Sequence, residues 1–136
     1  MNFTRMTAIS AIALAATFSL GACAEKPLST EEACQEIINQ VKEQNLETDA
    51  SSSLGDTVEQ GKKISAIFRS VANQAEAEFS ADLVALADNT DEVIAVVSDG
   101  SLSTQQMQVK MSLLDTEENR ALSDKLETTC PGLSDL

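Results

Sequence analysis

The chain has 136 residues, with 22 acidic and 9 basic side chains that give a formal net charge of −13 at pH 7. A surface this acidic repels nucleic acid and anionic lipid headgroups, so nucleic-acid binding is excluded and membrane binding through the domain's own surface is disfavoured. His, Trp and Tyr are absent. Their absence excludes imidazole bases, His-based metal sites and triads, and aromatic platforms for sugars or bases.

Residues 1–22 have the layout of a secretory signal peptide. Arg5 makes the start positive, and residues 7–20 form an apolar run broken only by small hydroxyl residues. This run is shorter than the roughly 20 residues that a transmembrane helix needs. We therefore expect a cleaved export signal. Its removal takes away one basic residue and no acidic residue, which makes the remaining chain still more acidic.

The apolar run ends at Leu20, Gly21, Ala22 and Cys23. This stretch resembles the lipobox of the bacterial lipoprotein family, which is a leucine, two small residues and a cysteine. The resemblance covers the first 23 residues and implies cleavage before Cys23, with acyl chains such as palmitate on its sulfur and on the new amino terminus. Two or more chains suffice for stable anchoring. The protein is then expected in the bacterial cell envelope, on the extracytoplasmic side of a membrane.

The family resemblance also accounts for the odd number of cysteines. If Cys23 carries lipid, Cys34 and Cys130 remain as an even pair. An exported domain lies in an oxidising compartment, where thiols pair. We therefore expect a disulfide between Cys34 and Cys130.

After a short tether at residues 23–28, residues 29–136 are expected to form one all-α domain. No proline occurs between Pro27 and Pro131, and the segment is rich in Ala, Glu, Gln, Leu and Lys, which favour helix. No convincing alternation of apolar and polar residues indicates a strand. The helical part looks like the small helical lipoproteins of unknown role in bacterial envelopes.

The first two helices have clear predicted positions. Ser29 and Glu32 form a capping box, so the first helix is expected to begin there and to end before the loop at residues 46–53. A second helix is expected from Leu54 to about Ala77. Gly61 lies in its apolar stripe and is expected to mark a close contact between helices.

The later boundaries leave alternatives open. A third helix is expected over residues 80–99; alternatively, the second helix continues to Ala87 and a new one begins at Asn89–Glu92, a possible second capping box. A fourth helix is expected from a further capping box at Ser103–Gln106 to Cys130. Asp115–Glu118 could kink or split it, because the apolar spacing slips there. Its expected inward residues are Met107, Met111, Leu114, Leu122 and Leu126.

The disulfide makes four helices the preferred number. In an antiparallel bundle with short loops, only an even number of traversals brings the start of the first helix beside the end of the last. We therefore expect a small antiparallel four-helix bundle, closed by a disulfide between its two ends. The loops at residues 46–53 and 98–103 then lie at the far end, facing solution.

No residue pattern predicts a catalytic or metal site or a bound cofactor. Acidic pairs at residues 31–32, 91–92 and 117–118 are expected to stabilise helix starts. Residues 88–92 offer oxygens to calcium but lack the ligand spacing of an EF-hand. Met107 and Met111 lie one helical turn apart and are expected to pack in the core rather than bind copper.

We therefore expect a lipid-anchored, non-enzymatic interaction module of the cell envelope, whose partners are the membrane and an envelope protein. The alternative is a small-ligand or lipid carrier that holds an apolar molecule between its helices. The many alanines and few bulky aromatics leave room inside, although small residues equally permit tight helix packing.

Overall fold

The computed structural model describes residues 26–46 and 54–133, and these form five helices and no strand. The expected all-α class is confirmed, but the expected count of four helices is wrong. Cys23, the expected signal peptide and most of the 46–53 loop lie outside the described residues. The helices in chain order are α1 (Thr30–Glu43), α2 (Leu54–Ala72), α3 (Ala77–Ser98), α4 (Thr104–Leu114) and α5 (Glu117–Thr129).

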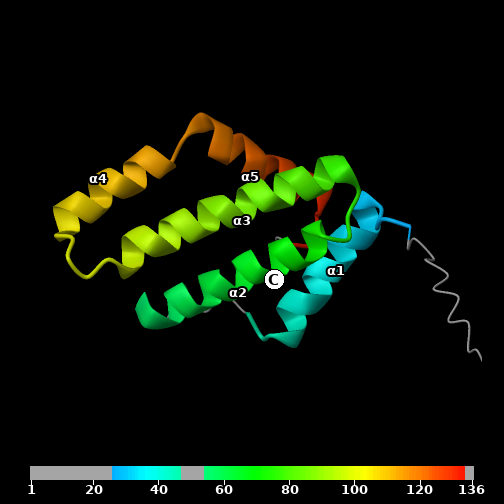
Figure 1. Ribbon diagram of the computed structural model, residues 1–136, viewed down its shortest axis with the longest axis horizontal. Coiled ribbons are helices and arrows are strands. Elements are labelled where there is room, and N and C mark those ends of the chain that lie inside the picture. Colours follow the sequence, from blue (N-terminus) through cyan, green and yellow to red (C-terminus); the bar gives the residue numbers. More distant parts are fainter. Residues whose placement is uncertain (1–25, 47–53, 134–136) are drawn as a thin grey trace, which may run out of the picture.

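The longest helix, α3, lies at the centre of the arrangement (Figure 1). Helix α2 runs antiparallel to it along one side, and α4 and α5 return along the other side. Helix α1 packs against α2 and also contacts α5. Helices α4 and α5 together therefore make the last of four traversals, which is why a chain of five helices still brings its two ends together.

One end of the molecule gathers the start of α1, the α2–α3 turn and the end of α5; we call it the disulfide end. The backbone of Leu28 donates to the carbonyl of Gln74 at 2.7 Å and accepts from the N–H of Glu76 at 3.0 Å. Cys34 and Cys130 form the expected disulfide, with their Cα atoms 5.3 Å apart. The 98–103 turn lies at the opposite end, as expected (Figure 1).

The tightly packed core lies near the disulfide end. Its largest completely buried side chains are Ile37, Ile67, Val71 and Leu83. Helices α4 and α5 have no buried residue, and Cys130, directly after α5, is completely buried. Since apolar burial is the main source of stability, α4 is held less firmly than the first three helices.

The second and third helices separate at residues 73–76. Of the two predicted arrangements, a helix that continues to Ala87 and restarts at Asn89 is wrong. The turn pairs with the backbone of Leu28, a distant contact that satisfies polar groups at the break. Asn89 lies inside α3, where its Oδ1 accepts from Nδ2 of Asn119 at 3.0 Å, so it caps no helix.

The predicted fourth helix is split, which was one of its two expected forms. Helix α4 ends at Leu114 and α5 begins at Glu117, with Thr116 as N-cap accepting from the backbone N–H of Asn119 at 3.1 Å. The capping boxes at Ser29 and Ser103 are both present, as predicted. These two predicted caps thus mark helix starts in the structure, whereas the alternative cap at Asn89 does not.

Candidate functional site

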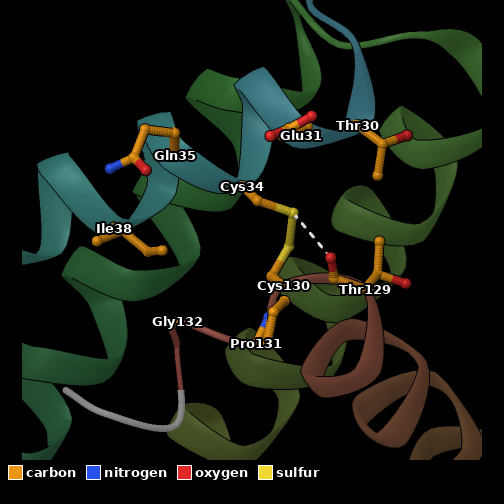
Figure 2. A pocket seen from close by; sticks show the side chains of 9 residues that line it. All are labelled: Thr30, Glu31, Cys34, Gln35, Ile38, Thr129, Cys130, Pro131 and Gly132. Atoms are coloured by element: carbon orange, nitrogen blue, oxygen red, sulfur yellow. Dashed lines mark hydrogen bonds between the residues drawn. A yellow bond between two sulfur atoms is a disulfide. The ribbon is translucent and has the colours of Figure 1, made fainter.

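The disulfide lies beside an open hollow of about 560 Å³ between the start of α1 and the end of α5. Figure 2 shows Thr30, Gln35 and Ile38 around it. The Sγ of Cys34 lies 3.6 Å from the carbonyl oxygen of Thr129, which is a packing contact because a disulfide sulfur carries no proton.

The two cysteines that line this hollow are not free thiols. Cys34 is 6% exposed and Cys130 is 0% exposed, and both are oxidised. The C-terminal turn lies so close to α1 that a Cβ on Gly132 would come within 2.8 Å of the Cδ1 of Ile38. The hollow therefore lies where the start of α1 and the C-terminal turn close on each other.

The acidic pairs at the starts of α1 and α5 act as helix-start residues, as expected. Glu32 completes the capping box of Ser29, whose backbone and side-chain hydrogen bonds lower the pKa of that carboxyl. The pair Asp91–Glu92 is an exception, because it lies inside α3. Asp91 instead binds Arg69 of α2, with 2.6 Å between Nη2 and Oδ2.

The segment 88–92, considered above for calcium, is a continuous part of α3, and the side chains of residues 88–91 have other partners. Arg69 also binds Asp88, with 2.8 Å between Nη2 and Oδ1. The hydroxyl of Thr90 donates to the carbonyl of Leu86 at 2.8 Å. Within residues 26–46 and 54–133, no three His, Cys, Asp or Glu side chains converge as metal ligands would.

Helix α4 turns one apolar face toward the rest of the molecule. Met107, Met111 and Leu114 on this face are half-buried. Met111 and Leu114 line a depression together with Val93 of α3 and Asn119 of α5. The two methionines thus lie on the packed side of α4, but they are half-buried and outside the core, so the expected core packing is met only in part.

A second apolar face of α4 points away from the protein. Val109 is 56% exposed and Leu113 is 70% exposed, the largest values among the exposed large apolar residues of the described chain. Beside them lies a shallow hollow of about 400 Å³. The α4 outer face, as we call this surface, consists of Leu102, Gln105, Gln106, Val109, Lys110 and Leu113.

The α4 outer face is nearly free of charge in a strongly acidic protein. Residues 100–114 contain no Asp or Glu, and Lys110 is their only charged side chain. The acids on either side are paired: Asp99 lies 4.0 Å from the Nζ of Lys110, and Asp115 binds Arg120. The hydroxyl and then the backbone N–H of Ser101 lower the pKa of Asp99, and Arg120 lowers the pKa of Asp115.

Val109 and Leu113 are not among the residues predicted from the sequence. The inward residues of this helix were predicted, but apolar residues occur on both sides of α4, so only the packing on α3 distinguishes the two faces. Their spacing of four residues is the one available signal, because it places both on one face.

No described helix has both the length and the apolar character required to cross a bilayer. Comparisons of the chain with protein-family models, curated proteins and solved structures gave no match.

Proposed function

We propose that the protein is a bacterial lipoprotein, anchored through Cys23 on the extracytoplasmic side of a membrane, and that it acts as a non-enzymatic interaction module. The observation that carries this proposal is the α4 outer face. Val109 and Leu113 expose apolar surface where neighbouring acids are paired or absent. Such a surface is suited to contact with a protein partner.

The position of the tether supports the same proposal. Lys26 lies three residues after Cys23, a separation that an extended chain spans with at most about 11 Å. The backbone of Leu28 is fixed at the disulfide end, so a lipid on Cys23 holds this end near the bilayer. The 98–103 turn at the other end then faces solution (Figure 1).

Anchoring is tested with the full-length chain and a Cys23→Ser variant. We expect the wild-type protein to float with membranes and its N-terminal peptide to carry the mass of acyl chains, whereas the variant carries none. Ala24→Ser is the matched control, because it alters the next residue and keeps the thiol. An unmodified Cys23 in the wild-type protein would refute the anchor.

The interaction is tested with a photoreactive side chain in place of Leu113 in the full-length protein, activated in intact cells. A second protein carries the same group in place of Val84, another exposed apolar residue, on α3. We expect repeated cross-linked products from position 113 and few from position 84. Equal products from both positions, or none from position 113, would contradict an interaction at the α4 outer face.

The carrier alternative has less support. Gly61 of α2 packs directly against Ile94 of α3, so this small residue serves close helix packing. A carrier would be stabilised against heat by lipids extracted from the envelope, and native mass spectrometry would detect the bound molecule.

A further inference from the structure

We propose that the partner bound by the α4 outer face is a second copy of this chain, in a twofold-symmetric antiparallel pairing of the two α4 helices. This inference rests on the proposed function in one respect, which is the use of the same surface. It adds the identity of the partner and the geometry of the contact.

The α4 outer face carries both a protruding residue and a hollow that can receive it. Leu113 protrudes, and the hollow is lined by Leu102, Gln105, Gln106, Val109 and Lys110. Leu113 lies four residues after Val109, or about 6 Å along the helix axis. Gln105 lies about 6 Å from Val109 in the opposite direction.

A twofold axis that passes beside Val109 places the level of Leu113 in one copy opposite the level of Gln105 in the other. In an antiparallel pair, such an axis reverses positions along the helix and keeps each residue on its own flank. Leu113 and Gln106 lie on the same flank, because a turn of about 100° per residue rotates them by about 40° and about 60° from Val109 in the same sense. Leu113 of each copy therefore meets the hollow of the other, and the two Val109 side chains meet at the axis.

Electrostatics also favours pairing through the α4 outer face. Two copies of a chain with a net charge of −13 repel each other over most of their surface. The α4 outer face has no carboxylate, and the flanking Asp99 and Asp115 are each paired with a base of their own chain. Contact through this face consequently brings no unpaired carboxylates from residues 99–115 together.

The size of the patch determines the strength of the contact. Six residues on one helix form an interface below the roughly 1,200 Å² at which stable complexes begin, which is the range of weak, transient association. A common membrane anchor raises the local concentration of the copies and favours such a contact. We therefore expect dimers on the membrane and mostly monomers of the detergent-solubilised chain at low concentration.

The test is oxidation of Val109→Cys in the full-length protein in membranes, compared with Val84→Cys. Both substitutions replace an exposed valine, Cys34 and Cys130 are buried, and Cys23 carries lipid in the proposed mature protein. We expect Val109→Cys to form a dimer that reductant separates, at least tenfold more abundant than that of Val84→Cys. Adding Leu113→Glu should lower the dimer yield by at least tenfold, because it brings negative charge into the hollow of the partner.

Three results would overturn the pairing: no dimer from Val109→Cys, equal dimer from both positions, or a yield that Leu113→Glu leaves unchanged. If the photoreactive group at position 113 captures a different protein while Val109→Cys gives no dimer, the interaction module stands and the self-pairing fails. If neither experiment gives a product, both fail.

Discussion

Gly61 of α2 lies directly against Ile94 of α3, and a Cβ on Gly61 would come within 3.1 Å of both Cγ1 and Cδ1 of the isoleucine. The two longest helices thus make close contact in the distal, half-buried part of the molecule. A glycine in a helix interior costs roughly 1 kcal/mol relative to alanine. The close approach explains why a glycine nevertheless occupies this position.

The first prediction follows from this contact. Gly61→Leu should lower the free energy of unfolding by about 1–3 kcal/mol, because the larger side chain overpacks the α2–α3 contact. Chemical denaturation measures the change. Gly100→Leu is the control, since a Cβ at Gly100 meets nothing within 4 Å. Ile94→Ala should partly restore the Gly61→Leu variant, and the absence of any restoration would argue against the direct contact.

The second prediction concerns the disulfide, which joins residues separated by 96 positions. Replacing Cys34 and Cys130 together by alanine should lower the free energy of unfolding by up to about 4–5 kcal/mol, because the unfolded chain regains the freedom of a long closed loop. Denaturation of the variant and of the reduced wild-type protein measures this loss. Equal denaturation midpoints for the oxidised wild type and the variant would contradict it.

A peptide map without reductant provides the direct control for this prediction. It should recover the peptides that contain Cys34 and Cys130 as one linked species. Recovery of both as free thiols would remove the basis for the stability difference.

Much of this fold was predictable because its signals are local. Ser29 and Ser103 are followed three residues later by Glu or Gln, and each begins a helix through a capping box. Thr116 begins α5 at the position where the predicted fourth helix loses its apolar spacing. The pairing of Cys34 with Cys130 followed from compartment and cysteine number once Cys23 was assigned to lipid.

The features that could not be predicted depend on tertiary contacts. Residues 73–76 contain neither Gly nor Pro, so the sequence left two positions open for the end of the second helix. The earlier one is correct, and backbone hydrogen bonds with Leu28 stabilise the break there. Asn89 has the sequence pattern of a helix cap, but its side chain accepts a hydrogen bond from Asn119 across the α3–α5 contact. The outward position of Val109 and Leu113 likewise depends on how α4 packs on α3, which residue spacing alone does not determine.

The third prediction concerns how the contacts of Asp91 with Ser65 and Arg69 affect stability at acidic pH. The hydroxyl of Ser65 and then the guanidinium of Arg69 hold the pKa of Asp91 below its usual value of 3.8. The folded state therefore favours the ionised carboxylate more than the unfolded state does. The resulting stability is present above pH 3.8 and is lost as the pH falls below it.

Asp91→Asn should accordingly reduce the loss of stability on acidification below pH 3.8. The effect should be modest, because both partners are about half exposed and solvent screens the pair. Denaturant unfolding at a series of pH values measures it. Glu92→Gln, which removes one negative charge at the next position, is the matched control, and identical acid profiles for the two variants would contradict a specific role of Asp91.

The fourth prediction concerns the joint between α4 and α5. Nδ2 of Asn119 donates to Oδ1 of Asn89 at 3.0 Å and to the carbonyl of Leu114 at 2.8 Å, so one side chain links the joint to α3. Asn119→Ala removes both hydrogen bonds and should cost about 1–2 kcal/mol locally. Because α4 has no buried residue, we expect this loss to appear mainly as looser attachment of α4.

Hydrogen exchange measured along the chain can distinguish local loosening from global destabilisation. In Asn119→Ala, amides of α4 should exchange several-fold faster, while those around Ile67 and Leu83 in the core should keep their protection, because that core is formed by the first three helices. Asn39→Ala, which removes an exposed side-chain hydrogen bond within α1, should leave α4 unchanged. Equal acceleration in the core and in α4 would mean that the joint cannot loosen independently, and that the α4 outer face is as rigid as the core.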